Sequence, residues 1–172
     1  INKEDPPVNI ERVTTQGTEI IASADFDRVG GVIDIGGSVG YTFLHARNHD
    51  DSPEDSVNMG DFVQYLPEHQ VTADLRLELK WGTSLTFWGR YYNGARIYVM
   101  AAAPEEFSPY STAFFTTARL HDPVMLNLRI AHAFLDHFEV WITARNLLDD
   151  YEMDPFNPGM GRMFYFGMKA WW

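Results

Sequence analysis

Hydrophobic and polar residues alternate strictly over residues 70–81 of this chain. Every odd-numbered residue there is apolar, from Val71 to Trp81, and every even-numbered residue is polar or charged, from Gln70 to Lys80. Successive side chains of a β-strand point to opposite faces, so the pattern predicts a strand with one apolar and one polar face. Its length is about twice the ~5–6 residues of an ordinary globular strand.

The same alternation recurs in other segments and predicts seven strands in all. The other segments are residues 13–26, 32–43, 84–92, 124–134, 137–146 and 162–172. Short turns are expected at residues 27–31, 81–84 and 135–137, and long polar links at residues 46–68, 97–123 and 147–161. Short turns at one rim and long loops at the other are typical of an outer-membrane barrel. We therefore expect an all-β fold, an antiparallel transmembrane β-barrel segment of about seven strands.

A soluble antiparallel sandwich is the alternative fold, because its half-buried strands also alternate. Strands of ~9–12 residues match the tilted length that crosses a bilayer, which favours the membrane. The alternation of short and long connections favours it too, as do the charges of Asp74, Arg76 and Glu78 on one face. The outer face of a sandwich also tolerates such charges, so both folds remain open at this point.

The composition of the chain excludes several classes of function. Its 172 residues include 13 Lys and Arg against 24 Asp and Glu, a net charge of −11, and nucleic-acid binding needs an excess of cations. The chain has no cysteine, so disulfides, thiol nucleophiles and Cys-based zinc sites are absent. The apolar run at residues 99–103 is far shorter than the ~20 residues of a membrane-spanning helix. Residues 1–7 do not have the pattern of a secretory signal.

Motifs for catalysis and metal binding are weak or missing. No Ser/His/Asp order, HExxH motif or glycine-rich phosphate loop occurs, so we expect neither an enzyme nor a cofactor. His45 and His49 lie four residues apart beside Asp50 and Asp51. Without helical geometry or supporting side chains we interpret them as solvated loop residues that bind divalent ions loosely at most, and no metal site is predicted.

Several motifs occur in an order that resembles one protein family. Asn146-Leu147-Leu148-Asp149-Asp150-Tyr151 is similar to the family motif Asn-Leu-Phe-Asp-x-x-Tyr, with Leu148 where Phe is usual and one residue instead of two before the Tyr. Residues 158–162 resemble the Pro-Gly-Arg run that opens the final strand of the family, and residues 66–69 resemble its Val-Pro-x-His entry to a strand. Over nearly its whole length, the chain resembles the C-terminal barrel of TonB-dependent outer-membrane receptors.

The resemblance implies that residues 1–172 form the C-terminal third of a plugged barrel of ~22 strands. Only a closed barrel leaves no unpaired edge in lipid, so another polypeptide or segment would supply the plug and the remaining strands. The resemblance also implies a location in the bacterial outer membrane, in contact with lipopolysaccharide. It further implies uptake of a scarce solute that is energised by an inner-membrane TonB-type complex. The solute would be a metal chelate, a siderophore or a cobalamin-like compound. A passive porin and a structural barrel subunit of a larger outer-membrane complex are the alternatives.

Candidate ligand contacts are aromatic and arginine side chains on the expected inner face or outer rim. Such groups offer a large contact area with few rotatable bonds. They are Trp88, Arg90, Tyr92, Tyr98, Tyr110, Arg129 and Arg145. For the arginines, the alternative is cross-strand ion pairing that orders a wet lumen.

The C-terminal residues carry a second resemblance. Tyr165, Gly167 and Trp172 resemble the terminal signal read by the outer-membrane assembly machinery, which docks the last strand by edge pairing. Ala170 differs from the usual bulky residue of that signal. Trp171 and Trp172 also fit an aromatic girdle at a membrane interface, and the two roles are compatible.

Overall fold

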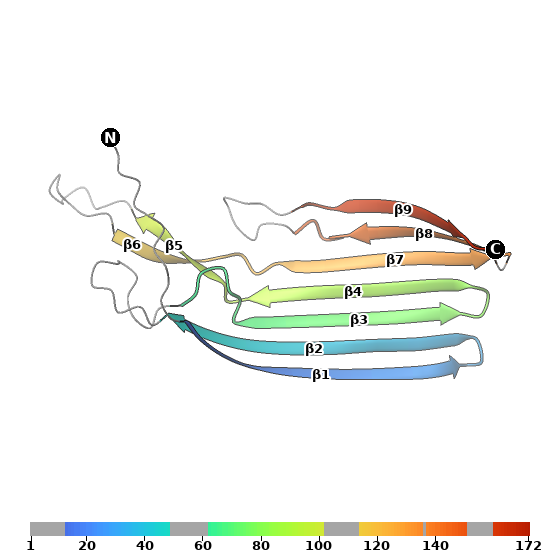
Figure 1. Cartoon of the computed structure of the whole chain (residues 1–172), viewed down its shortest axis with the longest axis horizontal. Coiled ribbons are helices and arrows are strands. Elements are labelled where there is room, and N and C mark those ends of the chain that lie inside the picture. The colour runs from blue at the N-terminus through green and yellow to red at the C-terminus, as the bar shows by residue number, and fades with distance from the viewer. Residues whose placement is uncertain (1–12, 49–61, 102–113, 136, 151–159) are drawn as a thin grey trace.

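The structure of the chain is a computed structural model that describes residues 13–48, 62–101, 114–135, 137–150 and 160–172. These residues form nine strands and no helix. The strands are β1 (Val13–Val29), β2 (Ile33–Asn48), β3 (His69–Leu79), β4 (Thr83–Asn93), β5 (Arg96–Ala101), β6 (Phe114–Arg119), β7 (Val124–Phe134), β8 (Phe138–Arg145) and β9 (Met163–Ala170). Seven of them form one antiparallel sheet in the order β1-β2-β3-β4-β7-β8-β9, and β5 pairs with β6 (Figure 1).

The predicted all-β, antiparallel architecture is confirmed, and so are the seven strands of its main sheet. The first two strands are longer than the alternation indicated, with 17 residues in β1 and 16 in β2. Tight turns join β1 to β2, β3 to β4 and β7 to β8, all at one end of the sheet (Figure 1). In the second of these turns, Gly82 has a φ of 82°, a backbone conformation that glycine adopts without steric cost.

The long polar link predicted over residues 97–123 contains strand structure, because most of β5 and all of β6 lie within it. Tyr91 of β4 pairs with Val124 of β7, and Arg96 of β5 pairs with Arg119 of β6. Arg96 lies five residues after Tyr91, and its partner Arg119 lies five residues before Val124. The two pairs therefore share one antiparallel register, and β5 and β6 continue the ladder of β4 and β7. Figure 1 shows this hairpin extending past the long-link end of the sheet.

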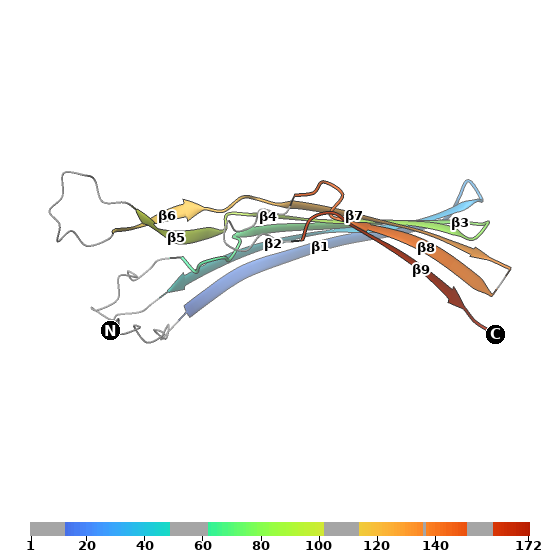
Figure 2. The same ribbon diagram turned by 90° about the horizontal axis from the view of Figure 1, so that it is seen from above.

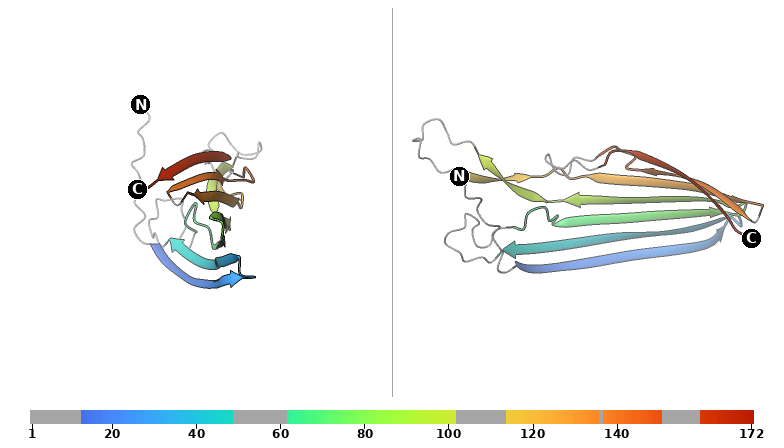
Figure 3. Two further views of the ribbon diagram at one scale, coloured as in Figure 1. Left: turned by 90° about the vertical axis from the view of Figure 1, so that its right-hand side faces the viewer. Right: turned by 45° about the horizontal axis from the view of Figure 1, so that its top comes forward.

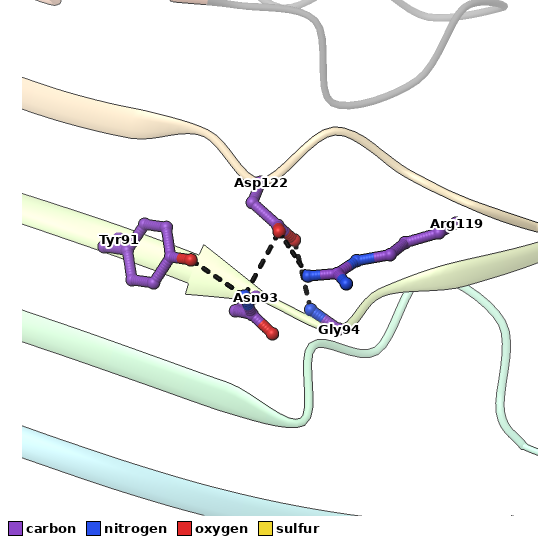
Figure 4. A network of polar contacts seen from close by, with 5 residues as sticks. All are labelled: Tyr91, Asn93, Gly94, Arg119 and Asp122. Carbon is purple, nitrogen blue, oxygen red and sulfur yellow. Dashed lines mark hydrogen bonds and ion pairs between the residues drawn. The ribbon is translucent and has the colours of Figure 1, made fainter.

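The junction between the sheet and this hairpin is held by Asp122 (Figure 4). Its carboxylate accepts hydrogen bonds from the Asn93 side chain at 3.1 Å and from the Gly94 backbone N–H at 3.1 Å. It also forms an ion pair with Arg119. The contacts of this one side chain therefore add to the backbone hydrogen bonds that remain beside the interruption, from the Tyr92 N–H to the Pro123 oxygen and from the Leu120 N–H to the Ala95 oxygen.

The strand register aligns like residues across the whole sheet. One row contains an apolar residue from each strand: Phe26, Ile35, Leu77, Leu85, Ile130, Ile142 and Phe166. The neighbouring row points to the other face and is largely polar: Asp25, Gly36, Arg76, Thr86, Arg129, Thr143 and Tyr165. A period of two therefore gives the complete sheet one apolar face and one polar face.

The sheet is a single layer that bends into an arc (Figure 2; Figure 3, left). In the described part of the chain, the backbone of each strand approaches only the strands beside it in its own sheet. The apolar face is consequently open: Ile20 is 62% exposed, Phe166 79% and Met168 83%. A soluble sandwich would cover these side chains with a second sheet, and among the described residues the only other sheet, β5-β6, does not pack against the main one.

Candidate functional site

A hollow of about 560 Å³ opens on the polar face, near the long-link end of the sheet. Its lining includes Asp74, Trp88, Arg90, Asn127, Arg145 and Met163, and we call it the arginine hollow. These residues come from β3, β4, β7, β8 and β9, so five strands contribute to the site.

The strand register explains how residues so far apart in the sequence meet in the arginine hollow. Trp88 of β4 is paired with Asp74 on one side and with Asn127 on the other. The Asn127 amide donates a hydrogen bond to the backbone oxygen of Trp88 at 3.2 Å. Further along the same face, Arg145 of β8 is paired with Met163 of β9. The side chains of these paired residues lie side by side because residues opposite one another in a ladder point to the same face.

The two arginines of the hollow rest against aromatic rings. Arg90 Nη1 donates a hydrogen bond to the Tyr92 hydroxyl at 2.6 Å, and its guanidinium carbon lies 5.6 Å from the centre of that ring. The guanidinium carbon of Arg145 lies 5.4 Å from the centre of the Tyr165 ring. Both distances fall in the range of cation–π attraction. The structure thus pairs Arg90 with Tyr92, both predicted ligand contacts, and pairs Arg145, predicted for the inner face, with Tyr165 of the predicted assembly signal.

Arg129, a predicted contact residue, does not line the arginine hollow. Its Nη2 forms an ion pair with Glu139 at 2.8 Å, and its guanidinium carbon lies 5.0 Å from the Trp141 ring centre. For this residue the structure therefore has the cross-strand ion pair that was the alternative to ligand contact. Among the other predicted contacts, Tyr98 belongs to β5, and Tyr110 lies outside the described residues.

Asn146 contributes to the hollow in a way that the sequence pattern did not indicate. It is only 5% exposed and has a φ of 52°. Its amide donates to the Met160 backbone oxygen at 3.2 Å, its side-chain oxygen accepts from the Asp150 N–H at 3.1 Å, and its own N–H donates to the Asn127 side chain at 3.1 Å. The motif that carried the family resemblance therefore fixes the rim of the hollow directly after Arg145.

The C-terminal residues of the predicted assembly signal lie on or after β9 at the edge of the sheet. Tyr165 and Gly167 are in β9, and Trp172 follows it with a fully exposed side chain. Gly167 pairs with Trp141, whose indole covers it. Within the described chain, β9 pairs only with β8, so its outer edge has free backbone groups.

A second hollow, of about 240 Å³, lies on the polar face at the turn end. Its lining includes the carboxylates of Asp25, Asp27, Asp34 and Glu78, and we call it the acidic hollow. Arg76 is the one cation among the described residues of this lining, and it lies 3.4 Å from the Asp25 carboxylate. The polar face therefore has opposite charge at its two hollows.

His45 lies on β2, where its Nε2 accepts a hydrogen bond from Arg47 at 2.9 Å, and His49 lies outside the described residues. In the ranges that the structure describes, no three His, Asp or Glu side chains are grouped so as to hold a metal ion. These ranges also contain no helix long and apolar enough to cross a membrane.

Comparison with models of known protein families found no match, and comparison with curated proteins found none either. Function is therefore inferred from the two faces of the sheet and from the arginine hollow.

Proposed function

We propose that this chain is part of the wall of a bacterial outer-membrane receptor that takes up a scarce solute. The apolar face would contact lipid, and the polar face would line the interior through which the solute passes. One observation carries the proposal: seven strands align an exposed apolar face opposite a polar face that contains a ligand-sized hollow.

The size of the apolar face argues for lipid as the surrounding medium. Soluble monomers seldom expose continuous apolar patches of more than a few hundred Å². Here the row from Phe26 to Phe166 crosses all seven strands, and six residues away along each strand a second row on the same face contains Ile20, Tyr41, Val71, Tyr91 and Val124. Exposure of this surface to water would be costly at ~25 cal/mol per Å² of apolar area.

Aromatic side chains at both ends of the apolar face also support a membrane location. Near the long-link end, His69 lies between Tyr41 and Phe43, with ring centres 6.1 and 5.3 Å apart. Near the turn end, the rings of Phe134 and Phe138 stack at 5.6 Å, and Trp81 is 61% exposed. Barrels in membranes place such rings at the two lipid–water interfaces.

The strand lengths fit the thickness of an outer membrane. β3, β4 and β7 each have 11 residues. At a rise of about 3.3 Å per residue, such a strand is about 36 Å long, and a tilt of about 45° reduces its height to about 25 Å. The apolar band of outer-membrane barrels is also about 25 Å tall.

The two outer strands define the partner that this proposal requires. Within the described chain, β1 pairs only with β2 and β9 only with β8. Unpaired backbone groups in hydrocarbon cost several kcal/mol each, so strands from another polypeptide or segment would complete the wall. That part would also carry the plug and the contact with an inner-membrane TonB-type energy-coupling complex.

Membrane fractionation tests the proposal. The full chain should sediment with outer membranes, resist extraction by alkaline carbonate and dissolve only with detergent. It should migrate with a partner polypeptide on a native gel, and mass spectrometry of that band should find plug and strand sequences. Recovery of the chain in the soluble fraction without detergent would contradict the proposal.

Conductance separates the receptor from the passive porin. A plugged receptor should give no steady channels when the purified complex is added to a planar lipid bilayer, because the plug blocks the interior. Stable open channels would favour the porin instead.

A further inference from the structure

The two arginines of the arginine hollow differ from the other arginines of the polar face. Among the described residues, neither Arg90 nor Arg145 forms an ion pair with a carboxylate, whereas Arg76 pairs with Asp25 and Arg129 with Glu139. Arg90 donates one hydrogen bond to a described residue, the one to Tyr92, and Arg145 donates none to the described part of the chain. A guanidinium has five N–H donors in a planar fork, so most of the donors of this pair are available to a ligand.

The arginine hollow has the size and mixed chemistry of a small-molecule site. Its volume of about 560 Å³ lies within the ~300–1,000 Å³ of typical ligand pockets. Trp88, Met125 and Met163 supply apolar surface, and the Asn127 and Asn146 amides lie at its border.

The charged groups of the arginine hollow favour an anionic ligand. Asp74 is the one carboxylate among the described lining residues, and its Oδ1 accepts a hydrogen bond from the Ser38 hydroxyl of β2. The described lining therefore has two cations, Arg90 and Arg145, and one anion.

The charge on the rest of the polar face also favours an anion at this end. The acidic hollow at the turn end has four carboxylates and one arginine in its described lining, so it repels a negatively charged solute. Fixed charges of opposite sign along one face attract a diffusing ion to the end of complementary charge.

From these observations we infer that the arginine hollow binds a small solute through an oxyanion, a carboxylate or phosphate group held by Arg90 and Arg145. Arginine forks bind both groups with charge-assisted hydrogen bonds. Trp88 and the methionines would contact the apolar part of the same solute. The inference rests on the proposed function in taking the polar face as the face that meets the solute, and it adds the chemical class of that solute.

Calorimetric titration tests the inference. The full chain, purified in detergent with any polypeptide that accompanies it, is titrated with citrate and separately with inorganic phosphate. We expect saturable binding of at least one probe. Arg90→Gln and Arg145→Gln should each weaken it about tenfold or more, because each removes charge-assisted hydrogen bonds. Higher salt should also weaken the binding, since the arginines are exposed to solvent.

The matched control is Arg76→Gln, the same substitution on the same face at a residue that is outside the arginine hollow and already paired with Asp25. It should leave the affinity within about twofold of the wild type, since it removes no donor from the hollow. Arg90→Lys and Arg145→Lys keep the positive charge but lose the planar guanidinium. Both variants should bind the probes with intermediate affinity, a result that misfolding caused by substitution at these positions would not give. No saturable binding of either probe, or an equal loss in Arg76→Gln, would overturn the inference.

A second arm distinguishes a small solute from an acidic protein segment as the occupant. If the accompanying polypeptide fills the arginine hollow with its own carboxylates, Arg90→Gln and Arg145→Gln will release that polypeptide, whereas the wild-type complex will bind neither probe. That result would overturn the small-solute inference. Membrane fractionation tests the proposed function separately. If the chain is found in the outer membrane but binds neither anion, only the inference about the arginine hollow is refuted. If the chain is soluble but its anion binding depends on the two arginines, only the membrane proposal is refuted.

Discussion

At the scale of single residues, the close packing of Gly167 and Trp141 shows how one position depends on the register of two strands. Gly167 of β9 is paired with Trp141 of β8, and a Cβ atom at position 167 would lie 2.3 Å from the Trp141 ring. The same indole lies 5.0 Å from the guanidinium carbon of Arg129, measured to the ring centre. Glycine at position 167 thus leaves room for a ring that also contacts an ion-paired arginine.

We predict that Gly167→Ala destabilises the sheet by about 1–3 kcal/mol, the usual cost of forcing an extra methyl group into a packed site. The measurement is the free energy of unfolding of the detergent-solubilised protein in urea. In a Trp141→Leu background the same substitution should cost much less, because the indole is gone. An equal cost in both backgrounds would show that the contact with Trp141 is not the cause.

At the scale of elements, the long hairpin formed by β4, β5, β6 and β7 consists of two ladders in one register. The pairing stops after Tyr91 and Val124 and resumes at Arg96 and Arg119. Near this break the backbone N–H of residue 120 donates to the carbonyl oxygen of residue 95 at 2.9 Å. Asp122 contacts both sides of the junction with one carboxylate (Figure 4). The Tyr65 N–H and the Glu68 carboxylate also hold Arg96 of β5.

Asp122→Ala should loosen this hairpin without unfolding the main sheet. Loss of the acceptor removes the side-chain partner of the Gly94 N–H and leaves the Asn93 amide with its hydrogen bond to the Tyr91 hydroxyl, a local cost of about 1–3 kcal/mol. Hydrogen exchange followed by mass spectrometry should show faster exchange in β5 and β6 and unchanged exchange in β3 and β8. Asp122→Asn keeps an acceptor oxygen and should have a smaller effect. Unchanged protection of β5 and β6 in Asp122→Ala would contradict the role of this carboxylate.

At the scale of the whole molecule, the sheet has two faces in different surroundings. Ser23 and Ala24 are neighbours on β1, and they belong to the polar and the apolar face respectively. Because the chain has no cysteine, a single introduced thiol reports on its own position alone.

We predict that the side chain introduced by Ala24→Cys faces lipid and the one introduced by Ser23→Cys faces water, in membranes that contain the full chain. A fluorescent label on the thiol of Ala24→Cys should be quenched by brominated lipid, and this thiol should react slowly with a water-soluble maleimide. The Ser23→Cys variant should show the reverse, since a β-strand directs adjacent side chains to opposite sides. Equal and rapid reaction of both thiols with the water-soluble reagent would exclude lipid contact for the apolar face.

Most of the main sheet was predictable from the sequence, and the arginine hollow only in part. Alternation identified the seven strands, and it placed Arg90 and Arg145 on one face. β5 and β6 were missed because each has only six residues and neither sequence, RIYVMA or FFTTAR, alternates clearly between apolar and polar residues. The sequence also could not separate Arg129 from Arg145, because ion pairing with Glu139 depends on which residues the ladder brings opposite each other.

The sequence by itself determined which residues form the strands of the main sheet and which face each side chain takes, because alternation is a property of the extended backbone at every residue. It also determined the negative charge and the absence of thiol chemistry. Only the tertiary structure decided which cations pair with carboxylates, where the hollows lie, and that β5 and β6 prolong the ladder of β4 and β7. These features depend on register between segments distant in the chain, and a shift of one residue would reverse the face of an entire strand.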